Sequence, residues 1–324
     1  MNCFDCKICN GIACRGQYPG VGGCGNGENF IRNYNELKKI TINFNFLCDD
    51  VTPNTKVTLF NKEFDMPIFM APIAGLKVNY GVDMADNDYI REMLLACKEV
   101  NNLFFQGDGI NQSLLNNKPL DIAKELNIGP VLTVKPWTKE GLDIRIDLFN
   151  KSNCFAMAMD IDGAGLGSFK NIENKVESKN VAALKDIKSR INKPFIVKGI
   201  ITVDAALKAV EAGVDAIVVS NHGGRILCDA PSTIEVLKDI VDAVDKKCLV
   251  FIDGGFRTGA DVFKALAIGA DAILIGRPST LSCIKGKKEG VINYYHKLQE
   301  ELIDVMKFCG VDNISKITRK YVNI

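Results

Sequence analysis

Short runs of apolar residues recur along the chain from Met66 onward. Each run is rich in Val, Ile, Leu, Phe and Met, and it is continuous rather than alternating, which is the pattern of a parallel strand buried on both faces. The pattern predicts eight strands, at 66–71, 103–106, 130–135, 155–161, 195–200, 216–221, 249–254 and 272–276.

Amphipathic stretches lie between these runs. They place apolar residues three and four positions apart, with charge on the opposite face, as surface helices do. They cover 89–100, 140–150, 181–191, 203–212, 233–244, 260–268 and 291–308. Eight βα units in about 250 residues fit an α/β fold of the (β/α)8 TIM barrel type, whose active site lies at the carboxyl ends of the strands. A doubly wound sheet stays open as the alternative, because periodicity does not report whether a sheet closes.

The first 65 residues differ from the rest of the chain. They begin with a cysteine- and glycine-rich part, and a short helical or strand segment follows at 30–59. We therefore expect an N-terminal extension, 1–65, that packs on a barrel formed by 66–324.

The composition of the 324 residues is that of an ordinary globular protein, with 47% hydrophobic and 24% charged residues. The net charge is only +1, so no overall field attracts nucleic acid or an anionic membrane, and we expect neither as a partner. No apolar run approaches the roughly 20 residues of a membrane span, and no secretory leader is recognisable. Most cysteines after residue 65 stand singly in apolar surroundings, as Cys97, Cys154 and Cys248 do. Such thiols predict a reducing, cytoplasmic environment.

Polar residues gather where the fifth and sixth predicted strands end. Lys198 lies near the end of the fifth strand. There it is either a binding partner for an anion or a flavin ring, or a surface residue that buries only the stem of its side chain. The chain has two histidines, and His222 follows the sixth strand within S-N-H-G-G-R at 220–225. A single histidine is more often structural, but this placement suits a general base. Arg225 offers a planar fork that matches a carboxylate or a phosphate.

The last two strands end in glycine and arginine. The seventh is followed by D-G-G-F-R at 253–257 and the eighth by G-R-P at 276–278. Barrels often bind phosphate after these strands, and Gly259 opens the next helix, so we expect a phosphate site here. The alternative is that these glycines only form tight turns. The sequence has no G-x-x-x-x-G-K-[ST] loop and no G-x-G-x-x-G opening a first βα unit, which disfavours a nucleotide hydrolase and a Rossmann dehydrogenase.

Several of these motifs occur together in one known family. They are K-P-F-I-V-K-G at 193–199, the S-N-H-G-G-R box, A-P-S-T-I at 230–234, D-G-G-F-R and G-R-P. With them, the stretch 193–278 resembles the FMN-dependent α-hydroxy acid oxidases and dehydrogenases, and the box is highly specific to that family. M-A-P-I-A at 70–74 and D-I-D at 160–162 add weaker support. The resemblance implies an FMN-binding barrel that oxidises a small 2-hydroxy acid, of the lactate or glycolate kind, to the 2-oxo acid.

The resemblance also implies a role for each matching residue. His222 resembles the base that takes the hydroxyl proton, Asp162 the carboxylate that supports the protonated histidine, and Arg225 the group that binds the substrate carboxylate. Lys198 resembles the lysine beside the pyrimidine end of the flavin, where it stabilises the reduced anion. The remaining expected FMN contacts are Pro72, Ile73, Ala74, Ser220, Asp253, Gly254, Gly255, Arg257, Gly276 and Arg277.

The substrate side departs from the family pattern. Where the family has a glutamine and a tyrosine on the third strand, this chain offers Thr133 and Lys135, and we expect Lys135 to contact the substrate. A second substrate tyrosine and an arginine after the fourth strand have no counterpart. The sequence therefore leaves the particular 2-hydroxy acid and the electron acceptor open.

Four cysteines stand close together near the N-terminus. Cys3, Cys6, Cys9 and Cys14 have C-x2-C-x2-C-x4-C spacing, near that of bacterial ferredoxins, and Cys24 follows. Neighbouring thiolates bind an iron–sulfur cluster or zinc. The alternatives are an exposed or redox-labile cysteine cluster in a flexible tail, without metal, and a coincidence in a cysteine-rich composition.

Three functions stay open at this point. The first is oxidation of a 2-hydroxy acid, which the presence of both His222 and Arg225 favours. The second is another FMN barrel enzyme, either an isomerase or a reductase fed by an N-terminal iron–sulfur centre. The third is a flavin-binding protein without turnover. For each of them we expect a homo-oligomer.

Overall fold

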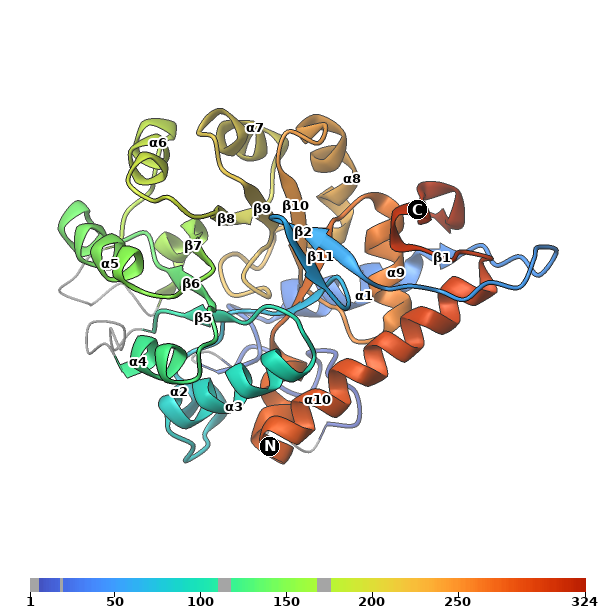
Figure 1. Ribbon diagram of the computed structural model, residues 1–324, viewed down its shortest axis with the longest axis horizontal. Helices are drawn as coiled ribbons and strands as arrows, with labels where there is room; N and C mark the ends of the chain where they lie inside the picture. The colour runs from blue at the N-terminus through green and yellow to red at the C-terminus, as the bar shows by residue number, and fades with distance from the viewer. Residues whose placement is uncertain (1–5, 18–19, 110–117, 168–175) are drawn as a thin grey trace.

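Eight parallel strands form the centre of the molecule, and helices surround them (Figure 1). The computed structural model describes residues 6–17, 20–109, 118–167 and 176–324. The strands follow the order β4-β11-β10-β9-β8-β7-β6-β5. The two end strands also meet, because Met70 forms a parallel bridge with Phe104 and its N–H donates to the carbonyl of Leu103 at 2.9 Å. The sheet closes into the predicted (β/α)8 barrel, and the doubly wound alternative is excluded.

The barrel strands coincide with the predicted apolar runs to within two residues at each end. They are β4 (Ile68–Met70), β5 (Phe105–Gly107), β6 (Val131–Val134), β7 (Ala156–Asp160), β8 (Phe195–Ile200), β9 (Ala216–Val219), β10 (Leu249–Asp253) and β11 (Ala272–Ile275). Every residue of β4, β6, β7, β9 and β11 is buried, as the continuous apolar pattern requires of a strand covered on both faces.

Seven helices correspond to the predicted amphipathic stretches. They are α3 (Asp86–Glu99), α5 (Lys139–Lys151), α6 (Val181–Ser189), α7 (Val203–Glu211), α8 (Thr233–Val244), α9 (Gly259–Ile268) and α10 (Arg277–Phe308). The prediction for α10 was wrong at its start. This helix begins directly after β11 and changes direction at Gly286 and Lys287, whose backbone is not helical. The apolar periodicity is therefore interrupted before residue 291.

Within the described ranges, three further helices were not predicted as such. They are α1 (Glu28–Lys39), α2 (Leu76–Tyr80) and α4 (Lys118–Glu125), and short 3-10 turns occur at η2 (Ile161–Gly165), η4 (Ile314–Lys316) and η5 (Arg319–Tyr321). The helices α2 and α4 are too short to show a clear periodicity. No helix of the described residues combines the length and the apolar character that a membrane span needs.

The inside of the barrel is apolar at one end and charged at the other. At the amino-terminal end, a hairpin of β2 (Val57–Leu59) and β3 (Lys62–Phe64) crosses the barrel, as Figure 1 shows, and Phe60 and Phe64 pack edge-on against Phe155, Phe69 and Phe251. Alternation along the strands then brings a ring of buried polar residues to the inner face near the carboxyl ends. The members of this polar ring are Lys135, Asp160, Lys198, Ser220 and Asp253.

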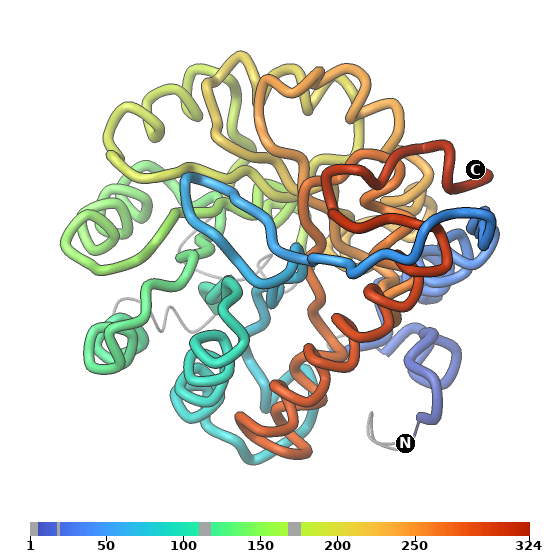
Figure 2. Tube along the Cα trace, turned by 45° about the vertical axis from the view of Figure 1, so that its right-hand side comes forward, coloured from blue at the N-terminus to red at the C-terminus, as the bar shows by residue number. Residues whose placement is uncertain are grey.

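The segment before the barrel packs on its outside. Helix α1 contacts α8 and α9, and the side chains of Asn33 and Asn221 exchange two hydrogen bonds of 2.8 and 2.9 Å. Strand β1 (Thr41–Ile42) pairs antiparallel with β12 (Val322–Asn323), so the C-terminus lies beside the early part of the chain (Figure 2). The division of the chain at residue 65 stays a prediction.

Candidate active site

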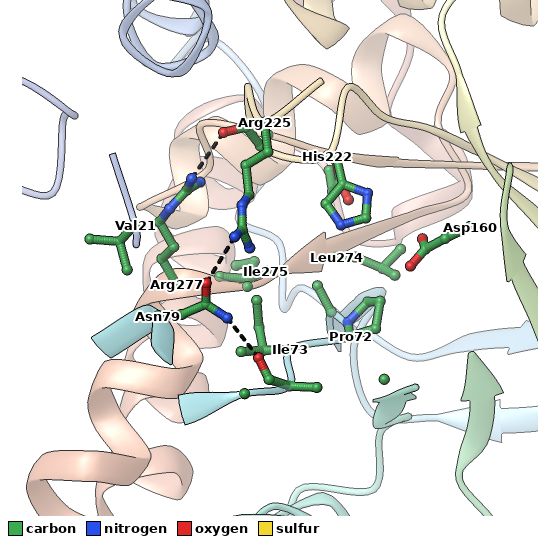
Figure 3. Close-up of a pocket in the computed structure, with 18 of the residues that line it drawn as sticks. Val21, Pro72, Ile73, Asn79, Asp160, His222, Arg225, Leu274, Ile275 and Arg277 are labelled. Atoms are coloured by element: carbon green, nitrogen blue, oxygen red, sulfur yellow. Dashed lines mark hydrogen bonds between the residues drawn. The ribbon is translucent and has the colours of Figure 1, made fainter. Parts of the chain in front are cut away.

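A cavity lies at the carboxyl ends of the strands, and most of the residues singled out in the sequence line it (Figure 3). These lining residues are Pro72, Ile73, Ala74, Lys135, Lys198, His222, Arg225, Asp253, Gly254, Gly255, Arg257, Gly276 and Arg277. Ser220 and Asp162 do not line the cavity themselves, but each contacts His222, which does. The structure therefore brings together the candidate residues from β4, β6, β7, β8, β9, β10 and β11.

His222 is held in a defined position above the end of β9. Its φ of 57° lies in the left-handed region, which is uncommon for a residue with a side chain and is often found at functional sites. The backbone N–H of His222 donates to the hydroxyl of Ser220 at 3.1 Å, and the imidazole Nδ1 lies 3.0 Å from Oδ1 of Asp162. Burial lowers the pKa of His222 below its ordinary value, with help from Lys135 and Lys198 and against the opposing effect of Asp162. The imidazole is therefore neutral near pH 7 and able to accept a proton.

Arg225 is oriented by a residue that the sequence did not point to. Its Nη2 donates to Oδ1 of Asn79 at 2.8 Å, and Nδ2 of Asn79 donates in turn to the carbonyl of Ala74 at 2.9 Å (Figure 3). Asn79 belongs to the short helix α2 and lies 146 residues before Arg225 in the chain. No motif marks it, so sequence analysis had no signal to find it.

The polar ring of the barrel contains an uninterrupted chain of alternating charges. The ammonium of Lys135 lies 2.7 Å from Oδ2 of Asp160, that of Lys198 lies 3.1 Å from Oδ1 of Asp160, and Lys198 lies 3.4 Å from Oδ2 of Asp253. Burial alone would raise the pKa of Asp160, but Lys135 and Lys198 outweigh it and hold that pKa well below the usual range. Burial alone would lower the pKa of Lys198, but Asp160 and Asp253 raise it.

Two arginines gather at the other end of the cavity. The guanidinium of Arg277 lies 3.9 Å from the centre of the Phe30 ring and donates to the carbonyl of Gly223 at 3.0 Å. Arg257 donates to the carbonyl of Cys9 at 2.8 Å. Burial lowers the pKa of Arg277, and the positive charges of Arg225 and Arg257 lower it further. Such a concentration of partly buried positive charge favours a bound anion.

The expected contribution of Gly259 to an anion site was wrong. Its N–H donates to the carboxylate of Glu301 at 2.8 Å, and Thr258 and Asp261 form a capping box at the start of α9. The start of α10, at Arg277 and Pro278, lines the cavity instead.

Two glycines near the carboxyl ends of the strands allow helix α1 to pack closely against the barrel. A Cβ on Gly255 would lie 2.1 Å from the carbonyl oxygen of Asn33, and one on Gly224 would lie 2.5 Å from the backbone nitrogen of Phe30. Both glycines have positive φ. Helix α1 can therefore approach the rim only because these positions lack side chains.

The residues at this site fit FMN. The two arginines suit a terminal phosphate, and Lys198 suits the end of a flavin ring that becomes negative on reduction. Asp253 lines the cavity, yet its Oδ1 is buried without a hydrogen-bond partner within the described part of the chain. A hydroxyl donor such as those of the ribityl chain satisfies an atom of this kind.

The N-terminal cysteines do not form a ligand set among the residues described. Cys3 lies outside them, and Cys6, Cys9 and Cys14 are free thiols. In the described ranges, only one group of three His, Cys, Asp or Glu side chains has its ligand atoms within 4.8 Å of one another, and it consists of Asp160, Asp162 and His222. Because Asp160 is paired with two lysines, this group does not suit a cation. The structure gives no support to the expected iron–sulfur or zinc site.

This chain resembles a known protein family over most of its length. The family model described as FMN-dependent dehydrogenase matches residues 20–105 and 131–324. A peroxisomal (S)-2-hydroxyacid oxidase GLO3 of Arabidopsis thaliana is 50% identical over 129 residues, which are 40% of this chain and 36% of that protein. A glycolate oxidase of Spinacia oleracea is 36% identical over 211 residues, which are 64% of this chain and 53% of that protein. The matched region thus spans about a third to a half of these relatives.

Solved structures match over nearly the full chain. A mandelate oxidase variant with (S)-mandelic acid has a TM-score of 0.80 and 27% identity, and the match covers 94% of this chain and 91% of that one. A putative lactate oxidase of Pediococcus acidilactici has a TM-score of 0.79 and 26% identity, covering 92% and 86%. With the family model matching most of the chain and the barrel reproducing these structures, this protein belongs to the FMN-dependent dehydrogenase family.

Proposed function

We propose that this protein is an FMN-dependent oxidoreductase that oxidises a small 2-hydroxy acid to the 2-oxo acid. The observation that carries the proposal is the pairing of His222 with Asp162 at 3.0 Å, together with the fact that His222 lines the same cavity as Arg225 and Lys198. The relatives named for (S)-2-hydroxyacid and glycolate oxidation support the substrate class.

The arrangement assigns a task to each of these side chains. Arg225, oriented by Asn79, binds the substrate carboxylate through its planar fork. Neutral His222 accepts the hydroxyl proton, and Asp162 stabilises the imidazolium that results. Bound FMN supplies the acceptor for the two electrons and the hydrogen that leave the substrate carbon.

Different residues would bind the phosphate and the flavin ring at the two ends of the cavity. Arg257 and Arg277 would hold the phosphate, with Gly254, Gly255 and Gly276 nearby in the cavity lining, and Asp253 would accept a hydrogen bond from the ribityl chain. Lys198 and Ser220 lie on the inner face of the barrel, where they would contact the flavin ring, and the backbone of Pro72, Ile73 and Ala74, which also line the cavity, would contact it as well. Lys135 lines the cavity beside Asp160, where it would contact the substrate.

Anaerobic mixing of the purified protein with a panel of 2-hydroxy acids tests this function. Bleaching of the flavin by at least one of them is the expected result. An intact yellow protein that no 2-hydroxy acid reduces would leave the isomerase and the non-catalytic binding protein as the remaining functions. The same panel, repeated with oxygen, a quinone and a nicotinamide, identifies the electron acceptor.

No feature of the described residues favours a reductase fed by an iron–sulfur centre, since no three of the described cysteine sulfurs lie within 4.8 Å of one another. Metal analysis of protein purified without oxygen checks this independently. Iron or zinc at a near-stoichiometric level would restore that alternative.

We also propose a cytoplasmic homo-oligomer. The support for the compartment is the state of the cysteines, because burial raises the pKa of Cys97 and Cys283 to about 12, as expected of inert thiols. Fractionation of cells and sedimentation of the purified protein test the compartment and the assembly.

A further inference from the structure

Asp160 lies between two lysines in the charged chain of the polar ring. Its two carboxylate oxygens are divided between Lys135, at 2.7 Å, and Lys198, at 3.1 Å. The side chains of Asp160 and Lys198 are only 2% and 3% exposed. Figure 3 shows the carboxylate of Asp160 directed toward the cavity, and Asp160, Lys135 and Lys198 all line it.

The charges of the four side chains balance. Lys135 and Lys198 carry two positive charges, and Asp160 and Asp253 carry two negative ones. Asp160 and Asp253 both contact Lys198, so its ammonium is compensated from two sides. In a buried site with little solvent to screen them, such charges act strongly on any neighbouring group that changes charge.

We propose that Asp160 is a positioning residue that keeps the electron affinity of the bound flavin low, by compensating Lys198, and that Lys135 balances Asp160 from the other side. The inference rests on the proposed function to the extent that FMN binds beside Lys198. A flavin gains negative charge when it takes up two electrons, and a carboxylate at Asp160 opposes that gain.

The proposal requires opposite effects from the two members of one ion pair. Asp160→Asn removes a negative charge and makes reduction of the flavin easier. Lys135→Gln removes a positive charge and makes it harder. The double variant Lys135→Gln/Asp160→Asn restores the balance. A purely structural role for the pair would instead move both single variants in the same direction.

The measurement is the equilibrium between bound FMN and a reference dye of known potential, during slow anaerobic reduction without substrate. We expect the equilibrium constant for two-electron reduction of bound FMN by the dye to rise at least about tenfold in Asp160→Asn. It should fall at least about tenfold in Lys135→Gln. The double variant should lie within roughly threefold of the wild type. Asp261→Asn is the matched control, because Asp261 is also a buried carboxylate between two lysines, Lys38 and Lys264, but does not line the cavity.

Several outcomes overturn the proposal. One is an unchanged or lowered constant in folded, FMN-bound Asp160→Asn, and another is a shift of equal size in Asp261→Asn. If Asp160→Asn does not fold, an unchanged or raised constant in Lys135→Gln overturns it equally. A wild-type protein that binds no FMN refutes this inference and the proposed function together. Bound FMN that no 2-hydroxy acid reduces refutes the proposed function alone, because the dye titration uses no substrate.

Discussion

Nδ1 of His222 lies 3.0 Å from Oδ1 of Asp162, although the two residues follow β9 and β7, which are separated by β8 in the barrel. The contact passes over Gly199 at the end of β8. A Cβ on Gly199 would lie 2.6 Å from Cγ of Asp162, and this glycine has a φ of 101°. The carboxylate reaches the imidazole because position 199 has no side chain.

Replacement of His222 tests the role of this residue as a base. We expect His222→Gln to slow flavin reduction by a 2-hydroxy acid about 10²–10⁴-fold, because the hydroxyl proton loses its acceptor. FMN should stay bound, and stopped-flow absorbance measures the rate. His296→Gln is the matched control, since His296 is exposed on α10, and it should be nearly silent. A wild-type rate in His222→Gln would remove the α-hydroxy acid mechanism.

The pH dependence of the reduction rate follows from the low pKa of His222. A base works when it is unprotonated, so the rate should rise with pH through a value below the ordinary histidine pKa of about 6.5 and then stay level. Asp162 raises the pKa of His222, so Asp162→Asn should move this limb to still lower pH. In Asp162→Asn the pH-independent rate reached above this pH should also fall at least about tenfold, because the imidazolium loses its partner. A limb that moves to higher pH would contradict the assignment.

Gly199→Ala should imitate the loss of Asp162 without removing the carboxylate. The added methyl group would displace Asp162 from His222, and we expect a fall of at least about tenfold in the reduction rate. The positive φ adds strain of order 1–2 kcal/mol, so thermal melting is measured alongside. Gly213→Ala is the control, because Gly213 also has positive φ but nothing lies within 4 Å of its added Cβ. Equal reduction rates in the two variants would show that Gly199 does not position Asp162.

The phosphate assignment predicts the effect of Arg277→Ala. Loss of one charge-assisted contact costs about 1.5–3 kcal/mol, which corresponds to FMN affinity weakened roughly ten- to hundredfold. Fluorescence titration of the apoprotein with FMN measures it. Arg319→Ala serves as control, because Arg319 lies on the outer surface and pairs with Asp242. Unchanged affinity in Arg277→Ala would place the phosphate elsewhere.

Asn79 should affect substrate binding through Arg225. Asn79→Ala removes the acceptor that orients the guanidinium, and we expect substrate affinity to weaken about tenfold. Asn79→Asp should weaken it further, because a carboxylate competes with the substrate for Arg225. Arg225→Lys should have the same kind of effect, since a point charge replaces a planar fork. The substrate dependence of the reduction rate separates binding from chemistry, and an unchanged dependence in Asn79→Asp would refute the role.

The sequence by itself determined the strands of the barrel and most of the residues at their carboxyl ends. Every position of β9 and β11 is buried and apolar, and this local pattern is visible without knowing any partner. The residues that end them, including His222 and Arg277, share one rim because all strands of the barrel are parallel. The resemblance to a known family then suggested that Asp162 serves His222, a contact that the structure contains.

Only the tertiary structure decided the contacts between distant segments. Asn79 and Arg225 are 146 residues apart, and Lys135 and Asp160 are 25 apart on neighbouring strands. Their side chains meet because of strand order and helix placement, to which neither local sequence refers. The same holds for Gly255, whose sequence context suggested a turn or a ligand contact. Its open side is occupied by Asn33 of α1, because the space beside a glycine belongs to whichever segment the fold brings there.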